Sequence, residues 1–322
     1  MNQLKKIGIT ALAGTLATLS AAQAGSLSVS GSAEVSYTQR DSGEMTGNPI
    51  GMDKAISFAG SGELDNGWTV SVGHALTDAA AWDDSWLSIG MGSLGTIWID
   101  QGDGKDMGSA LDNVVPQAFE EADAGLGTGL KVSGSAINDN GAITYKLPVF
   151  SGLQLGGSYN PRSGAASNAD GATSEGSGNE GWEFGADWSP EMVPGLRVGG
   201  VIGECDDCKA ASKDLEEETF FATYAYGPLS VGYQVAEVKD GTTTYETDIY
   251  GVSFNVNDAL SVSYQYGETD GYAGSVTAKF KGISAAYNIG PMAIKFTDNT
   301  GTNMNGTSSD DDNRELNLSM SF

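Results

Sequence analysis

The stretch LSVSYQY (260–266) alternates apolar with polar side chains at every position. The stretch LSVGYQV (229–235) and the chain end RELNLSMSF (314–322) repeat this alternation. Successive side chains of a β-strand point to opposite faces, so each stretch predicts a strand with one apolar and one polar or small-residue face. No segment beyond residue 25 shows a sustained helical period, and the chain is therefore predicted to be all-β.

Sixteen such strands fit the sequence, separated by turn-forming Gly, Pro, Asn and Asp residues. An even number returns the chain to the side on which it started, and closing the sheet into a barrel removes its edges. The apolar parity slips near Gly282, where we expect a β-bulge. The expected limits are 26–38, 53–64, 68–76, 84–91, 95–101, 142–150, 153–160, 181–189, 196–204, 218–227, 229–238, 247–256, 259–267, 275–289, 291–298 and 314–322.

The apolar faces have two possible surroundings, a protein core in a soluble sandwich or lipid around an outer-membrane barrel. The polar faces carry Ser, Gly, Thr, Gln and Ala with few Lys or Glu, which suits a crowded lumen better than an open water surface. The connections alternate between short turns and long loops, as in membrane barrels. These features favour a 16-stranded antiparallel transmembrane β-barrel, with a secreted soluble β protein or adhesin as the alternative. Aromatic residues near strand ends also match interfacial girdles: Trp182, Trp188, Tyr224, Tyr226, Tyr264 and Tyr266.

The N-terminal segment MNQLKKIGITALAGTLATLSAAQA has the three parts of a secretory signal peptide. Lys5 and Lys6 form the basic region, an uncharged apolar stretch follows, and Ala22-Gln23-Ala24 is a small-x-small cleavage site. We expect removal of residues 1–24 and a single barrel domain over residues 25–322, with a short buried helix as the alternative for the segment. No later stretch approaches the ~18 apolar residues of a membrane helix.

Charge and composition exclude several function classes. The 42 acidic and 16 basic residues give a formal charge of −26, which argues against nucleic acid because its phosphates would be repelled. The single histidine, His74, excludes a two-histidine metal site and leaves an enzyme poorly supported, since hydrolases need a nucleophile, a base and an orienting group. Cys205 and Cys208 form a C-x-x-C pair, which in an exported chain favours a small disulfide loop.

The connection over residues 102–141, after the fifth predicted strand, is the longest in the chain. Compact domains rarely carry so long a loop without a function. A short helix broken by Pro116 is possible over residues 111–121, and the stretch LKVSGSAI (130–137) is left open as a further strand.

These features together resemble the trimeric sixteen-stranded porins of Gram-negative outer membranes. The signal peptide runs directly into the strand LSVSGSAEVSYT, and NGAITYKLPVFSGLQLGGSY resembles the sixth and seventh strands of that family. The terminal Phe322 after an alternating strand is similar to the signal that the barrel assembly machinery reads. The resemblance implies an outer-membrane, homotrimeric general diffusion porin embedded in lipid, whose third loop folds inward and narrows the pore.

In that family, carboxylates of the third loop face a basic cluster on the opposite wall. The corresponding loop acids here are Asp103, Asp106, Asp112, Glu120, Glu121 and Asp123. The wall departs from the family pattern, since residues 55–104 contain no Lys or Arg. The basic residues that parity places inward are Lys146, Arg197, Lys279, Lys281 and Lys295.

The expected function is passive diffusion of small hydrophilic solutes and ions through a water-filled pore, with no catalytic residue and no cofactor. Excess carboxylate in a narrow passage raises the local cation concentration, so a cation preference is predicted. A substrate-selective channel, for example for sugars, is the alternative within this class. The acidic runs 216–218 and 310–312 are expected in solvated outer loops, where loose binding of a divalent cation is possible.

Overall fold

A computed structural model describes residues 25–40, 48–76, 82–132, 137, 141–161, 180–209, 213–272 and 276–321. In this part of the chain, sixteen strands form one closed antiparallel barrel, and β1 pairs with β16 to complete it. The predicted barrel is therefore confirmed. The predicted signal peptide and Phe322 lie outside the described residues.

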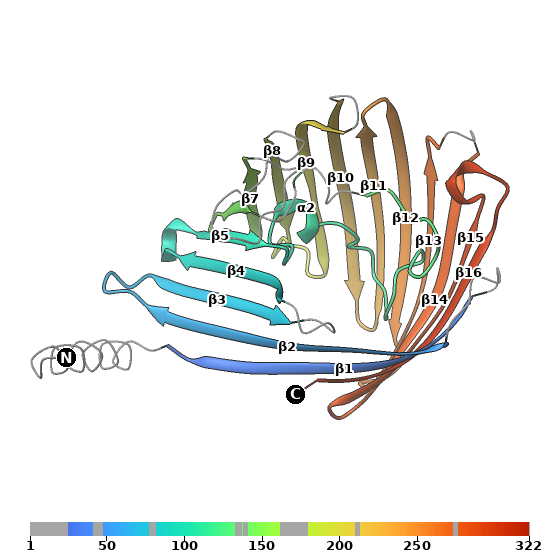
Figure 1. The fold of residues 1–322 in the computed structure, drawn as a ribbon, viewed down its shortest axis with the longest axis horizontal. Coiled ribbons are helices and arrows are strands. Elements are labelled where there is room, and N and C mark those ends of the chain that lie inside the picture. The colour runs from blue at the N-terminus through green and yellow to red at the C-terminus, as the bar shows by residue number, and fades with distance from the viewer. Residues whose placement is uncertain are drawn as a thin grey trace, which may run out of the picture.

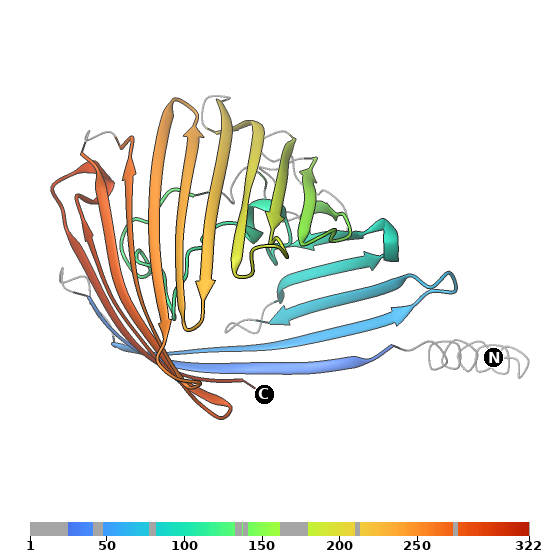
Figure 2. The same ribbon diagram turned by 180° about the vertical axis from the view of Figure 1, so that it is seen from behind.

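The first eight strands are β1 (Leu27–Arg40), β2 (Ile50–Glu63), β3 (Thr69–Leu76), β4 (Trp82–Gly90), β5 (Thr96–Gln101), β6 (Ala142–Lys146), β7 (Leu153–Asn160) and β8 (Gly181–Trp188). The other eight are β9 (Leu196–Lys209), β10 (Lys213–Tyr226), β11 (Leu229–Asp240), β12 (Thr243–Asn255), β13 (Leu260–Asp270), β14 (Ala278–Ile289), β15 (Met292–Thr302) and β16 (Asp311–Ser321). Short helical turns are η1 (Gly92–Leu94), α2 (Met107–Ala110) and η2 (Met304–Gly306). The segment after β5, including α2, runs through the space that the strands enclose (Figures 1 and 2). No described helix is long and apolar enough to span a membrane.

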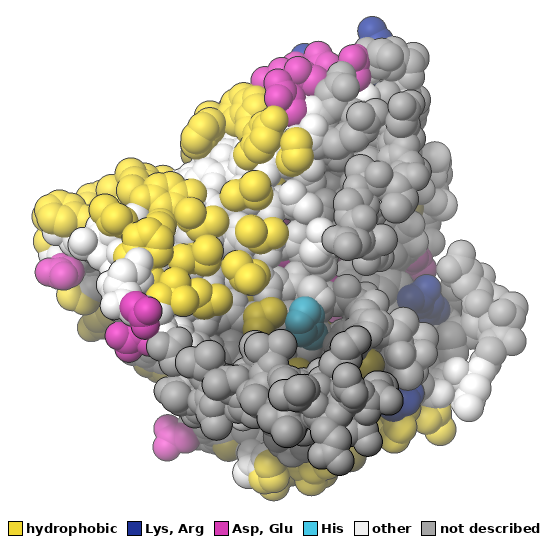
Figure 3. Space-filling model, turned by 60° about the vertical axis from the view of Figure 1, so that its left-hand side comes forward, with side chains coloured by type: hydrophobic (Ala, Val, Ile, Leu, Met, Phe, Trp, Pro, Cys, Tyr) yellow, Lys and Arg dark blue, Asp and Glu magenta, His cyan; other side chains and the backbone are white. Residues whose placement is uncertain are grey.

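The alternating sequence places apolar side chains outside the barrel. Val231 and Tyr233 of β11 and Tyr250 of β12 face outward and are 42 %, 39 % and 49 % exposed. Gln234 and Ile249, one position along each strand, face inward and are fully buried. An apolar outer face on a closed barrel suits lipid, which offers no partner to backbone polar groups. Figure 3 shows a broad area of hydrophobic side chains on one face of the molecule, with acidic side chains at its edges.

The bulge expected near Gly282 is wrong. Gly282 pairs in unbroken register with Gln265 of β13 and Asn299 of β15. The parity slips because Phe280, on the upper part of β14, faces inward and is fully buried beneath the long loop. Along β14 the inward-facing side chains change from apolar to small or polar, while the pairing of the strand with its neighbours continues without interruption. Register shifts occur instead at His74/Leu76 and Lys213/Leu215.

The acidic runs differ from their expected place in outer loops. Glu216, Glu217 and Glu218 belong to β10, which starts at Lys213 and so extends further than predicted. Glu217 faces inward and is only 3 % exposed, whereas Glu216 faces outward and pairs with Lys239. Only the first residue of the run 310–312 lies outside β16.

We expect Val252→Arg to destabilise the barrel in lipid by about 2–4 kcal/mol, because Val252 faces outward between the apolar side chains of Tyr250 and Phe254. Unfolding titrations in lipid vesicles measure the loss. The matched control is Ser253→Arg, whose side chain points into the lumen from the same strand. Equal losses for the two variants would contradict the assignment of faces.

Candidate functional site: the constriction inside the barrel

The long loop turns into the barrel because Asp100, at the end of β5, binds its first backbone N–H groups. The Asp100 carboxylate accepts hydrogen bonds from Gln101, Asp103 and Lys105 at 2.8, 2.9 and 2.6 Å. Asp106 then caps α2 by accepting the Ser109 N–H at 2.7 Å. Three such bonds to one side chain fix the direction in which the loop leaves the wall.

The helix lies at α2 and not over residues 111–121, where the sequence left a short helix possible. After Leu111 the loop N–H groups bind side chains of the barrel wall, so they are not available for helical hydrogen bonds. Val114 donates to Gln234 Oε1 at 3.0 Å and Ala122 donates to Gln265 Oε1 at 2.7 Å. Ala118 and Phe119 donate to Ser263 Oγ and Ser284 Oγ at 2.9 and 3.1 Å. Met107, at the start of α2, donates to Ser158 Oγ at 2.8 Å. The described residues of 130–137 form no strand.

A row of inward-facing glycines forms the groove in which the loop lies. A Cβ added to Gly232 or Gly251 would approach Pro116 Cδ to 2.4 Å and Val115 Cβ to 2.9 Å, respectively. The same holds at Gly267, where the nearest atom belongs to Leu130 at 2.7 Å. Any larger residue at these positions would push the loop away from the wall.

The far part of the loop is held by a dry apolar cluster inside the barrel. Ala122 of the loop packs with Tyr272, Ala278, Phe280 and Met304, all at most 8 % exposed. Leu126, Leu130 and Tyr245 pack around this cluster. Burial of apolar surface thus supplements the hydrogen bonds that hold the loop on the wall.

The solute passage lies on the opposite side of the lumen. Apart from the bonds to Asp100 of β5, where the loop leaves and rejoins the wall, all described hydrogen bonds from loop N–H groups to the wall go to β7, β8, β11, β13, β14 and β16. The space that remains is bounded by the loop and by β1–β6.

Two of the predicted inward basic side chains, Arg197 and Lys295, are held by carboxylates. Arg197 binds Asp187 in a two-pronged ion pair, with Nη2 2.8 Å from Oδ2, and lies 5.0 Å from the Phe221 ring centroid. Lys295 Nζ lies 2.9 Å from Glu34 Oε2. Lys146 of β6 also faces inward, on the same side of the strand as the buried Thr144, and it is near Asp106 and Asp100.

Lys279 and Lys281 are corrections, because both point away from the lumen. They alternate with the buried Phe280, and Lys279 Nζ lies 3.9 Å from Glu268 Oε2 on the outer face. Parity alone misassigned them because it took the apolar side chains of this strand as outward.

The predicted loop acids divide into several roles. Asp103 contacts Lys105, while Asp106 is 1 % exposed and caps α2. Asp123 accepts the Leu130 N–H at 2.7 Å and so closes a turn of the loop. Asp112, Glu120 and Glu121 are partly buried loop residues. Asp112 is near Glu217 of β10, and Glu120 is near Lys295, Glu34 and Glu315.

Comparison with known proteins identifies the family of this barrel. The family model of Gram-negative porins matches residues 8–298, most of the chain. The chain belongs to the Gram-negative porin family. This porin is an outer-membrane channel protein, and a secreted soluble protein is excluded as an alternative.

Solved porin structures share the fold of this porin. An anion-selective porin from Comamonas acidovorans has a TM-score of 0.65 at 15 % identity, over 92 % of this chain and 99 % of that chain. A triple mutant of the Rhodopseudomonas blastica porin has a TM-score of 0.65 at 15 % identity, over 92 % and 100 %. Salmonella typhi OmpF has a TM-score of 0.65 at 12 % identity, over 92 % and 98 %. No curated protein matches the sequence.

Several charged residues of the porin lumen were missed by the sequence analysis. Glu34 and Glu315 face the lumen from β1 and β16, and Glu183 and Glu217 are buried behind the loop on β8 and β10. Each lies on the polar face of an alternating strand, a signal that was available in the sequence. Lys105 carried no such signal, because its place depends on the turn around Asp100.

Glu183 and Asp106 anchor α2 of the porin loop. Glu183 Oε2 accepts the Gly108 N–H at 2.7 Å, and the two carboxyl groups lie within hydrogen-bonding reach of each other. Carboxylates stabilise a helix N-terminus through its exposed N–H groups.

Cys205 and Cys208 form a disulfide at the outer part of β9. Among the described residues, no group of three or more His, Cys, Asp or Glu side chains is arranged to hold a metal.

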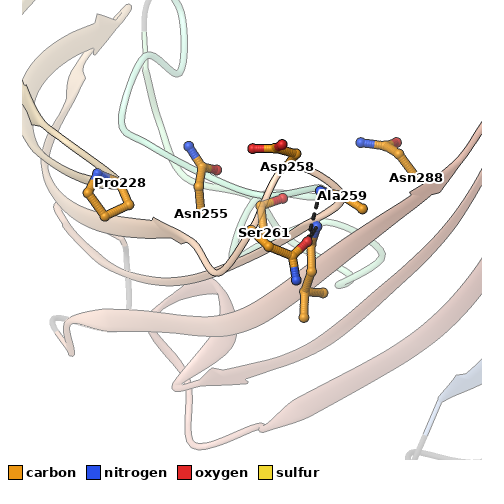
Figure 4. A pocket seen from close by; sticks show the side chains of 8 residues that line it. Pro228, Asn255, Asp258, Ala259, Ser261 and Asn288 are labelled. Atoms are coloured by element: carbon orange, nitrogen blue, oxygen red, sulfur yellow. Dashed lines mark hydrogen bonds between the residues drawn. The ribbon is translucent and has the colours of Figure 1, made fainter.

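A second hollow lies among the short turns of the porin. It has a volume of about 340 Å³ and is lined by Pro228 of the turn after β10, by the turn after β12, and by Asn255 and Asn288 near the ends of β12 and β14 (Figure 4). Asn257 Oδ1 accepts the N–H groups of Ala259 and Leu260 at 2.9 and 3.0 Å, which fixes the turn there. This hollow lies at the barrel end, apart from the constriction.

Burial raises the pKa values of four loop carboxylates. The pKa of Asp112 is raised to about 7, first by burial and then by the carboxylates of Glu121, Asp123, Glu217 and Asp106. Burial is also the leading cause that raises the pKa values of Glu120, Glu121 and Asp123. The negative charge of the loop therefore increases as the pH rises through neutrality.

We expect Gly251→Leu to lower single-channel conductance, because the new side chain displaces Val115 and Pro116 toward the passage. Such overpacking costs about 1–3 kcal/mol of loop docking. Planar-bilayer recording measures the change, with Ser253→Leu on the same inner face as the control. Unchanged conductance in Gly251→Leu would show that the loop does not rest on this strand.

We expect the ratio of cation to anion permeability to fall as the pH is lowered from about 8 to about 6, because Asp112 with a pKa near 7 gains a proton and loses its charge. Asp112→Asn should remove most of this change and resemble the low-pH channel at every pH. Reversal potentials in a salt gradient measure the ratio, and an unaltered pH profile in the variant would contradict the assignment.

Proposed function

We propose that this porin is a passive, cation-preferring diffusion channel for small hydrophilic solutes and ions. The fold and family establish the channel, and the charges inside the barrel support the ion preference. No reaction step is needed, since solutes move down their own gradients.

One observation carries the preference: three lumen-facing basic side chains are neutralised by carboxylates in direct contact. Arg197 binds Asp187, Lys295 binds Glu34, and Lys105 binds Asp103. Further carboxylates, among them Glu120, Glu121 and Glu315, add negative charge to the loop and wall. Within low-dielectric walls this surplus attracts cations and repels anions.

The shared barrel does not decide ion preference. The solved Comamonas acidovorans porin is described as anion-selective, and it has the same fold as this chain. Selectivity in such barrels must therefore follow from the side chains that line the passage, which at 15 % identity differ greatly between the two proteins.

We further propose the assembly and processing of the chain. Residues 1–24 are removed as a signal peptide, residues 25–322 form the mature barrel, and the barrel assembly machinery reads the end at Phe322. Three copies assemble through β1 and β2, where the outward positions of Gly31, Ala33 and Gly60 are small enough for close approach. Outer carboxylates bind divalent cations loosely, and no cofactor is needed.

Reversal potentials in a potassium chloride gradient across a planar bilayer test the ion preference, and conductance steps in groups of three test the trimer. We expect a potential of the sign that favours potassium. Glu34→Gln leaves Lys295 unpaired in the passage and should shift the potential toward chloride, whereas Lys295→Met should shift it further toward potassium.

The two variants form a matched pair, because each removes one member of the same ion pair, whose side chains are both 27 % exposed. Shifts of opposite sign support the proposal. A wild-type potential that favours chloride contradicts the cation preference, and shifts of equal sign contradict the role of this pair.

A further inference from the structure

Two tryptophans of neighbouring strands face the passage. Trp86 of β4 pairs with Asp100 of β5, and Trp98 of β5 pairs with Ser88 and Thr144, which are both buried inside the barrel. The ring centroids of Trp86 and Trp98 are 5.1 Å apart, and the planes are inclined by 54°. Both side chains are partly exposed. The pair therefore presents aromatic surface on the side of the lumen that the loop leaves open.

The wall behind Trp86 is shaped to hold its ring. A Cβ at Gly73 of β3 would lie 2.4 Å from two atoms of the Trp86 indole, so only glycine allows the ring to rest on this strand. The ring is thereby placed against the wall, close to Trp98. Such support from the wall limits the motion of the ring and makes its position reproducible.

The ammonium group of Lys105 already lies against this pair of aromatic rings. Lys105 Nζ lies 5.8 Å from the ring centroids of both Trp86 and Trp98, within the range of cation–π attraction. The same ammonium contacts the Asp103 carboxylate. Two indole faces and a carboxylate are a set of groups that recognises an organic ammonium, and tryptophan is the strongest aromatic partner.

We propose that Trp86, Trp98 and Asp103 form a binding site for organic ammonium solutes in the passage. The ammonium group of Lys105 competes with these solutes for the site. Lys105 reaches the rings on a flexible stem and is 32 % exposed, so an arriving ammonium can replace it without rearrangement of the wall. The displaced Lys105 remains in water within the lumen. The site extends the proposed function, since a cation-preferring pore concentrates such solutes at its constriction.

The test is block of potassium current through single channels in planar bilayers by tetramethylammonium, with glucose as the neutral probe. We expect saturable block by tetramethylammonium and none by glucose. Trp86→Ala and Trp98→Ala should each weaken the block about fivefold, and Trp98→Phe should weaken it less. Trp182→Ala, which alters an outward-facing ring, is the control for general effects of losing a tryptophan.

Lys105→Met provides a test that does not depend on losing an aromatic side chain. It vacates the site and should strengthen block by tetramethylammonium. Because it also removes a positive charge from the lumen, Lys295→Met is the matched control, and the gain must exceed the gain in that variant. Equal gains in the two variants, or block insensitive to both tryptophans, overturn the proposal.

Two other results separate this site from the alternatives. Block by glucose that equals block by tetramethylammonium and depends on the same tryptophans overturns the ammonium site in favour of a sugar subsite. Reversal potentials recorded in the same bilayers report the ion preference independently. A reversal potential that favours chloride, together with tryptophan-dependent block, supports the ammonium site and rejects the cation preference. A potential that favours potassium, together with block that does not depend on the tryptophans, rejects the ammonium site alone.

Discussion

The structure depends on closure of the sheet, which gives each strand a partner on both sides. Lipid offers no hydrogen-bond partner to a backbone N–H or C=O, so an open edge would carry a large cost at every residue. Pairing of β1 with β16 removes the last edge, and the outer face is then free to be apolar. This constraint explains why the side chains alternate so regularly between the two faces.

Closure also creates an interior that is too wide for side chains alone to fill. The loop after β5 occupies part of it by replacing helical hydrogen bonds with bonds to the wall, such as those of Gln234 and Gln265. Glycines provide the groove, and the apolar cluster around Phe280 holds the far part. The loop thus behaves as a packed element of the barrel, and the channel is confined to the side bounded by β1–β6.

The electrostatics of the lumen follow from this packing. Carboxylates outnumber basic groups, and Arg197 and Lys295 are in direct contact with the carboxylates of Asp187 and Glu34. Burial beneath the loop keeps the pKa of Asp112 near neutrality, so the charge of the constriction responds to pH. The aromatic pair at Lys105 adds a chemical preference to what charge alone would provide.

The sequence by itself determined the class of fold, the number of strands and the identity of the long loop, because a period of two and the spacing of turns are local properties. It also identified most of the acidic loop residues. Only the tertiary structure decided that Lys279 and Lys281 face outward and that Lys105 lies on Trp86 and Trp98. The physical reason is that an apolar side chain such as that of Phe280 packs against whichever surface excludes water. Inside this barrel the dry surface is supplied by a loop more than a hundred residues earlier in the chain.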